Sequence, residues 1–187
     1  MTIRLCLIVA LSSGFLFGQN LLTNGDFEQD LSNGWTQTQG GGGYHTVMRG
    51  TAYHPDSDNE VYTQQYDGSG YTKLYQVVDV TTVDLELSFW AKYALGGGSS
   101  VCWPVSSVDV EYYNSGGVLL GDTRFYYHNA YCNWRQAGNR SLYDVADPDW
   151  MLYTLNIRQE IDDNLPSINP SEVARIGVAL YDYTSGG

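Results

Sequence analysis

The chain has 187 residues, of which 21 are acidic and 9 are basic, and its formal net charge is −12. This length suits one domain with a single hydrophobic core. The negative charge argues against a nucleic-acid partner and against an anionic membrane surface, because both repel acidic proteins. The sequence therefore predicts one acidic domain that binds neither.

The N-terminus has the composition of a secretory signal peptide. Arg4 precedes an apolar run over residues 5–17, which is too short to span a membrane. We expect residues 1–18 to be a signal peptide and residues 19–187 to form a secreted or cell-surface domain. Leu16 is larger than the residue usual at this distance before a cleavage site, which leaves an uncleaved anchor as the alternative.

Three cysteines are present, and Cys6 would leave with the signal peptide. The two that remain, Cys102 and Cys132, predict one disulfide, because paired cysteines are typical of exported proteins. On the chain-entropy model, closing a loop of this length stabilises a fold by about 3 to 4 kcal/mol.

The first third of the chain predicts short strands separated by turns. A short strand and a turn over residues 20–34 lead to Trp35, which we assign to core packing. Residues 36–44 are predicted to be a loop, because they contain four consecutive glycines. Weak strands are predicted near residues 45–49 and 61–66.

Alternation of apolar and polar residues predicts three clear strands, over residues 71–80, 85–94 and 107–113. In the second of these, the apolar residues would face the core, and the other face would carry Trp90 beside Lys92. An exposed indole among hydrogen-bonding groups suits a sugar ring, whose C–H face packs on aromatic rings.

The remaining segments predict more strands and two long loops. Strands are expected over residues 118–120, 123–127, 151–157 and 173–183, and loops over residues 128–149, tied down by the disulfide, and 159–171. No segment has a clear helical period. Many short alternating strands with glycine-rich turns predict an all-β protein, an antiparallel β-sandwich of jelly-roll type.

Several segments resemble the jelly-roll carbohydrate-binding modules of the galactose-binding-like superfamily, particularly families 4, 9 and 22. Residues 20–35 resemble their NLLxNGxFE opening followed by GW. Residues 74–80 and 85–92 resemble their paired strands LxQxVxV and LxFWAK, and residues 150–157 and 174–180 fit two later strands. The resemblance covers most of the chain after residue 18 and implies binding of a polysaccharide or other glycan.

The end of the chain departs from this family's pattern. Family members close with one more strand, carrying a paired Asp, after the strand that residues 176–183 resemble. Here the sequence stops at Gly187. We therefore expect a sandwich that lacks its last strand and a fragment of a longer chain with further domains.

The resemblance also implies a structural Ca²⁺ ion held by Glu28, by backbone carbonyls and by the Asp of the closing strand. That Asp is absent here, so an occupied calcium site and no site are both open. A second acidic cluster, Asp56, Asp58 and Glu60, lacks the Gly and the later Glu of an EF-hand loop, and a solvated turn is favoured there.

Candidate ligand-binding residues are the aromatic and charged side chains predicted to lie outside the core. A sugar site needs flat rings for stacking and planar polar groups for hydroxyls. If the strands lie side by side, these residues form one aromatic and acidic platform; for each, packing inside the protein is the alternative. The candidates are Trp90, Lys92, Trp103, Glu111, Tyr113, Trp134 and Tyr181.

Nothing in the sequence singles out a catalytic group. A glycosidase needs two facing carboxylates, and no pair stands out among the 21 acidic residues. The three histidines lack metal-ligand spacing, and GxSxG and HExxH do not occur. The sequence predicts a non-catalytic carbohydrate-binding module. The alternatives are a structural or adhesive β-sandwich without a sugar site, and a fragment of a glycosidase or peptidase whose catalytic domain lies elsewhere.

Overall fold

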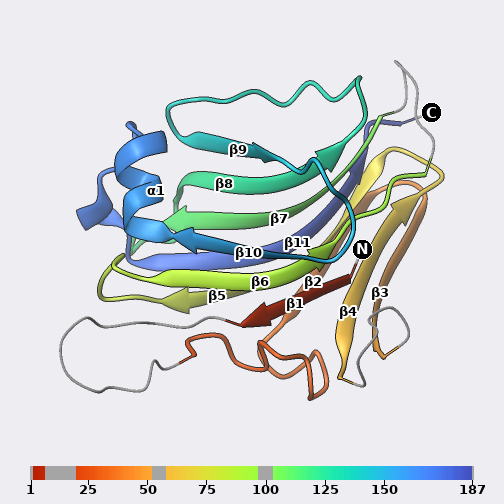
Figure 1. Ribbon diagram of the computed structural model, residues 1–187, viewed down its shortest axis with the longest axis horizontal. Helices are drawn as coiled ribbons and strands as arrows, with labels where there is room; N and C mark the ends of the chain where they lie inside the picture. Colours follow the sequence, from red (N-terminus) through yellow and green to blue (C-terminus); the bar gives the residue numbers. More distant parts are fainter. Residues whose placement is uncertain (1, 7–19, 52–57, 97–102, 187) are drawn as a thin grey trace.

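Two β-sheets pack face to face in the computed structural model, which describes residues 2–6, 20–51, 58–96 and 103–186 (Figure 1). Across one sheet the strands are β10 (Met151–Asn156), β6 (Glu86–Lys92), β1 (Thr2–Cys6), β4 (Glu60–Tyr66) and β3 (Tyr44–Gly50). Across the other they are β2 (Thr36–Gly41), β5 (Gly70–Asp79), β11 (Arg175–Thr184), β7 (Pro104–Tyr113), β8 (Leu119–His128) and β9 (Arg140–Asp144). The predicted all-β sandwich is confirmed.

The hydrophobic core lies between the sheets, where the alternation placed it. On β6, Phe89 is 1% exposed, and its ring centroid lies 5.3 Å from that of Phe125 and 5.2 Å from that of Tyr153. Trp35 is buried as predicted, 5.0 Å from the ring of Phe27. The apolar face of β6 therefore lies in the core, as predicted.

The predicted loop over residues 36–44 is wrong, because β2 forms there and pairs with β5. The glycines permit this pairing rather than preventing it. Gly41 has φ +83°, and a Cβ atom at this position would lie 2.2 Å from Ser69 O. A side chain would therefore collide with the neighbouring backbone.

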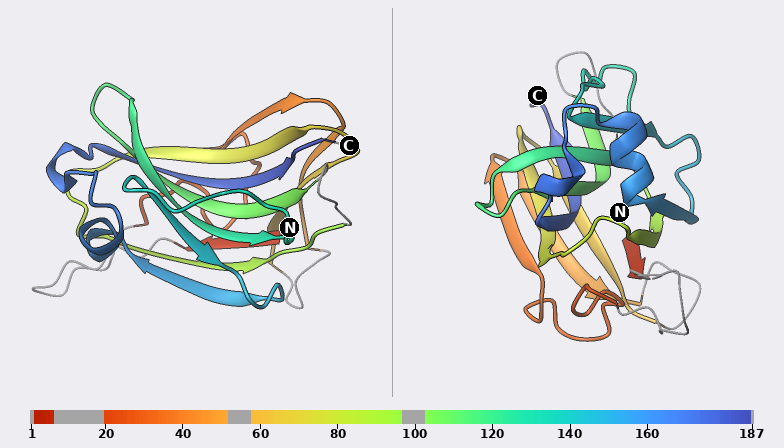
Figure 2. Two further views of the ribbon diagram at one scale, coloured as in Figure 1. Left: turned by 90° about the horizontal axis from the view of Figure 1, so that it is seen from above. Right: turned by 90° about the vertical axis from the view of Figure 1, so that its left-hand side faces the viewer.

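The predicted loop over residues 159–171 is also wrong, because it contains helix α1 (Ile157–Asn164) and the 3₁₀ turn η1 (Pro170–Glu172). The Asn156 side chain caps α1 by accepting a hydrogen bond from Gln159 N at 2.9 Å. Figure 2 shows α1 at one end of the two layers. At eight residues, the helix is too short to give a clear periodic signal.

The predicted loop over residues 128–149 contains β9, which pairs in parallel with β8. Residues 129–139, which we call the strap, connect these two strands. The two short strands predicted over residues 118–127 are one continuous strand, β8.

Strand β1 belongs to the predicted signal peptide. It pairs with β6 over five positions and with β4 over two, so it joins the two halves of the five-stranded sheet. Cleavage after residue 18 would remove it and leave β4 and β6 without the strand between them. In the described ranges, no helix is long and apolar enough to cross a membrane.

Replacing Phe89 by Ala is expected to lower the free energy of unfolding by about 3 to 5 kcal/mol, because it leaves a cavity beside the rings of Phe125 and Tyr153. Urea unfolding followed by circular dichroism measures this. Val118→Ala is the control, since this side chain is 61% exposed, and it should change the value by less than about 0.5 kcal/mol. Equal effects at the two positions would contradict the placement of the core.

Candidate functional site

The outer face of the six-stranded sheet gathers aromatic and charged side chains. Strand alternation directs every second residue of β5, β11, β7 and β8 away from the core. We call the following residues the tyrosine face: Tyr71, Lys73, Tyr75, Ser107, Asp109, Glu111, Tyr113, Asp122, Arg124, Tyr126, Tyr181 and Tyr183.

Tyr181 is at the centre of the ring contacts on this face. Its ring centroid lies 5.8 Å from that of Tyr71 at an interplanar angle of 22°, and 6.4 Å from that of Tyr183 at 8°. Trp134, from the strap, lies 6.3 Å from Tyr181 and 5.8 Å from Tyr126. Five rings from three elements and the strap are therefore close together, at interplanar angles of 8° to 34°.

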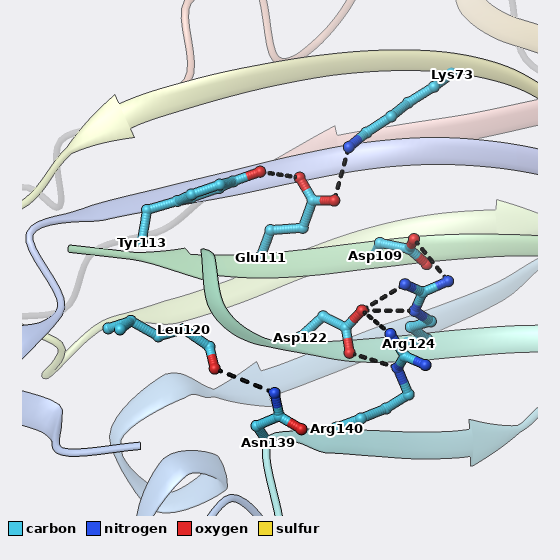
Figure 3. A network of polar contacts seen from close by, with 9 residues as sticks. All are labelled: Lys73, Asp109, Glu111, Tyr113, Leu120, Asp122, Arg124, Asn139 and Arg140. Atoms are coloured by element: carbon cyan, nitrogen blue, oxygen red, sulfur yellow. Dashed lines mark hydrogen bonds and ion pairs between the residues drawn. The ribbon is translucent and has the colours of Figure 1, made fainter. Parts of the chain in front are cut away.

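Arg124 and Arg140 neutralise two buried carboxylates beside these rings (Figure 3). Arg124 Nε donates to Asp122 Oδ2 at 2.8 Å, and Arg124 Nη1 lies 3.5 Å from Asp109 Oδ2. Arg140 Nε donates to Asp122 Oδ1 at 2.8 Å. Asp122 and Asp109 are 1% and 2% exposed, so these pairs are well shielded from water.

A second group of contacts surrounds Glu111. Lys73 Nζ donates to Glu111 Oε1 and the Tyr113 hydroxyl donates to Glu111 Oε2, both at 2.6 Å (Figure 3). Lys73 Nζ also lies 5.1 Å from the ring centroid of Tyr75. Both carboxylate oxygens of Glu111 are thus engaged by neighbours on the same face.

Burial shifts the pKa values of several of these groups. It raises the pKa of Asp109 from 3.8 to about 6, although the nearby Arg124 guanidinium opposes the rise. Burial, followed by the hydrogen bond to Glu111, raises the pKa of Tyr113. For Arg124, burial alone would lower the pKa, but Asp109 and Asp122 raise it above its usual value, so its positive charge is secure.

The structure brings some of the predicted ligand-binding residues together and separates others. Glu111, Tyr113 and Tyr181 lie on the tyrosine face, and Trp134 lies over it. Trp103 is at one end of the sheet, with its ring 5.3 Å from that of Tyr183.

Trp90 and Lys92 lie on the outer face of the five-stranded sheet, on the opposite side of the sandwich. Trp90 is 42% exposed beside Leu152, its partner on β10, and Lys92 Nζ forms an ion pair of 2.9 Å with Asp149. The single platform expected from the sequence is therefore divided between two faces.

The residues around Glu28 already use the oxygens that a calcium ion would need. Both Glu28 carboxylate oxygens accept hydrogen bonds from Asn59, at 2.7 and 2.8 Å. The carbonyl oxygens of Phe27 and Glu28 accept from the Arg49 guanidinium at 2.5 and 2.8 Å. The positively charged Arg49 guanidinium therefore occupies the carbonyl oxygens that a calcium ion bound to Glu28 would need, and these residues do not fit a calcium site. Among the described residues, no cluster of three or more acidic, His or Cys side chains could hold a metal.

Of the two cysteines predicted to form a disulfide, Cys132 lies in the strap with a free thiol, and burial raises its pKa. Cys102 lies outside the described residues. The disulfide stays a prediction.

Tyr71, Arg124 and Tyr183 were not among the residues predicted to contact a ligand. Tyr71 and Tyr183 extend alternations already recognised, two residues before Lys73 and two after Tyr181. That signal was available in the sequence. No sequence pattern indicates that the strap folds back to place Trp134 on Arg124.

A pocket of about 670 Å³ lies at one end of the sandwich, between β4 and the ends of β7 and β11. Its lining includes Asp182, whose carboxylate accepts hydrogen bonds from Thr63 and Ser106, both at 2.5 Å. Because that carboxylate is buried and already accepts two hydrogen bonds, it is not free to bind a ligand in this pocket.

No protein-family model and no curated protein matches the chain. Among solved structures, it is similar to the enzymatically active domain of tailspike protein 4 of bacteriophage CBA120, with 15% identity over 90% of this chain and 21% of that one, and a TM-score of 0.51. The chain thus spans about a fifth of the tailspike chain, and the likeness shows a shared fold.

Similar structures also include β-sandwich carbohydrate-binding modules. One, from a study of modules of the β-sandwich superfamily, has 10% identity over 81% of this chain and 55% of that one, with a TM-score of 0.47. Another is the family 11 module of Clostridium thermocellum in complex with a β-1,3-1,4-mixed-linked tetrasaccharide, with 16% identity over 86% of this chain and 89% of that one, and a TM-score of 0.43. The resemblance to families 4, 9 and 22 stays a prediction.

Replacing Asp109 by Asn is expected to remove the part of the pH dependence of the free energy of unfolding that ionisation of Asp109 causes. Since the folded state holds the Asp109 proton more tightly than the unfolded chain, ionisation lowers the wild-type free energy of unfolding as pH rises from about 4 to about 6. Asn cannot ionise, so the stability of the variant relative to wild type should rise across this window, by up to about 3 kcal/mol. Urea unfolding at pH 4 and pH 7 measures the change. A difference that is the same at both pH values would contradict it.

Proposed function

We propose that this protein is a non-catalytic carbohydrate-binding module that binds a neutral glycan on the tyrosine face. The observation that carries the proposal is the set of nearly parallel rings around Tyr181, next to charged groups that are already paired. The chain's similarity in fold to known β-sandwich structures is compatible with this function but does not select it.

The rings supply stacking surfaces for sugars. The C–H groups of a pyranose pack against the flat face of an aromatic side chain, and a tyrosine can also donate a hydrogen bond from its hydroxyl. Tyr71, Tyr181 and Tyr126 are each partly exposed, and their rings are held by neighbouring rings. Such pre-ordered rings lose little conformational entropy when a ligand binds.

The charges favour a neutral ligand over an anionic one. Lys73 is paired with Glu111, and Arg124 and Arg140 are paired with Asp122 and Asp109. No net positive charge therefore remains among these six groups, and the whole chain carries −12. Sulfated or uronic-acid polysaccharides would be repelled.

The same pairing argues against catalysis at this face. A glycosidase needs one carboxylic acid and one carboxylate facing the scissile bond across about 5 to 9.5 Å. Asp109 and Asp122 are buried and paired with arginines, so neither is free to act as the acid or the nucleophile at a scissile bond.

The proposal includes the cellular context expected from the sequence. Export with loss of residues 1–18 would deliver the module outside the cell, where polysaccharides and further domains of the same chain would be its partners. A structural or adhesive β-sandwich without a sugar site is the alternative, and the binding experiment distinguishes the two.

The full-length protein and single variants are compared on affinity gels containing neutral and anionic polysaccharides. We expect a neutral polysaccharide to retard the wild type, and Tyr181→Ala to weaken this binding about tenfold or more through loss of the central stacking ring. Anionic polysaccharides should not retard it.

Tyr44→Ala is the matched control, because Tyr44 is 60% exposed on the other sheet, and Trp90→Ala tests the opposite face. Both should bind as the wild type does, and thermal unfolding verifies that each variant is folded. Loss of binding in Trp90→Ala but not in Tyr181→Ala would move the site to the five-stranded sheet. Failure of the folded wild type with every polysaccharide would favour the structural or adhesive function.

A further inference from the structure

Two tyrosines of the tyrosine face flank one small residue. Ser107 on β7 is paired with Tyr181 on β11 and with Tyr126 on β8. Since neighbouring strands lie about 4.8 Å apart, the backbones of these tyrosines are about 10 Å apart. Ser107 is too small to fill the space between the two rings, and Ala179, beside the next outward residue Asp109, is small too.

The indole of Trp134 lies in this space. Its centroid is 5.8 Å from that of Tyr126 and 6.3 Å from that of Tyr181, at interplanar angles of 25° and 34°. The Arg124 guanidinium lies 4.4 Å from the same ring, a cation–π distance. A flat ring from outside the sheet thus occupies the position in which a ligand ring would stack on both tyrosines.

The polar groups beside the indole are incompletely satisfied. Ser107 Oγ and Asp109 Oδ1 are buried, and neither forms a hydrogen bond of normal geometry within the described residues, although the Ser107 side chain lies close enough to Asp109 to interact with its carboxylate. An unsatisfied buried polar atom is costly, and the indole carries only one N–H group with which to compensate. A ligand with several adjacent hydroxyls could donate to one of these atoms and accept from the other.

The backbone around Trp134 does not tie it into the sheet. The Trp134 carbonyl oxygen accepts a hydrogen bond from Arg135 Nη1 at 2.7 Å, and Cys132 N donates to Asn129 O at 3.1 Å, both within the strap. The strap is joined to other elements nearer its end, where Gly138 O accepts from Ser167 N at 2.9 Å. The indole could therefore leave the face without breaking the pairing of β7, β8 and β11.

We propose that Trp134 is an internal occupant of the ligand site, and that a glycan ring binds by displacing it from between Tyr126 and Tyr181. This rests on the proposed function of the tyrosine face and adds a conformational step to it. The displaced site offers a sugar ring two tyrosine faces, with the Ser107 hydroxyl and the Asp109 carboxylate below. The unliganded protein keeps these surfaces covered with its own indole, and binding of the glycan carries the cost of removing that indole.

The test is isothermal titration of wild type, Trp134→Ala and Tyr181→Ala with a soluble oligosaccharide of the polysaccharide that retards the protein. Trp134→Ala should bind about 5- to 30-fold more tightly, because the indole contacts with two rings and a guanidinium no longer compete. Trp90→Ala, an exposed indole on the other sheet, is the matched control and should not change the affinity.

A second readout follows the indole itself. In protein labelled with 5-fluorotryptophan, the fluorine resonance of Trp134 is assigned by its absence in Trp134→Phe. Saturating oligosaccharide should move this resonance toward its position in the urea-unfolded chain. A resonance that stays at its unliganded position or moves further from the unfolded one would overturn the displacement.

The outcomes separate this inference from the function on which it rests. If wild type binds and Trp134→Ala binds less tightly or equally, Trp134 is a ligand contact or a bystander, and the inference fails while the proposed function stands. If wild type binds and Trp134→Ala binds more tightly, the internal occupant is confirmed. If neither binds any glycan, both proposals fail.

Discussion

The outer face of the six-stranded sheet carries buried carboxylates, and the fold depends on their neutralisation by arginine side chains. Strand β7 is buried on both sides: Val108 and Val110 face the core, while Asp109 faces outward and is only 2% exposed. Burying unpaired charge costs several kcal/mol, so this arrangement requires a partner of opposite charge. Arg124 provides it, and it does the same for Asp122 on its own strand.

One guanidinium thereby links several elements. Arg124 contacts β7 through Asp109 and the strap through the ring of Trp134, and Asp122 extends the network to Arg140 on β9. The order of the outer face, including the positions of the rings, follows from these contacts. The tyrosines proposed to bind a glycan thus lie on strands that these ion pairs link to one another, which suits a site whose tyrosine rings keep their positions while Trp134 is displaced.

Alternation along single strands allowed most of the fold to be predicted. The apolar residues of β6 were correctly predicted to face the core, and Glu111, Tyr113 and Tyr181 were correctly placed outside it. The predictions failed where pairing between distant segments decides the structure. The glycines of β2 belong to a strand because β5 pairs with them, and α1 is held by a cap and two buried isoleucines over only eight residues.

The candidate site was predictable only in part, for a related reason. Alternation shows which residues of one strand share a face, but it does not show in which sheet that strand lies. Trp90 and Tyr181 both point outward, yet they belong to different sheets and face opposite directions. The strap was not predictable at all, since Trp134 is placed by contacts with Arg124, Tyr126 and Tyr181 that no local pattern encodes.

The most direct test of the central claim is a map of amide chemical-shift changes in ¹⁵N-labelled protein on addition of a neutral oligosaccharide. We predict that the largest changes fall on β5, β11, β7 and β8, around Tyr71, Ser107 and Tyr181, and on the strap. Changes centred on Trp90 and Leu152, or none with any glycan, would contradict the assignment of the tyrosine face as the binding site.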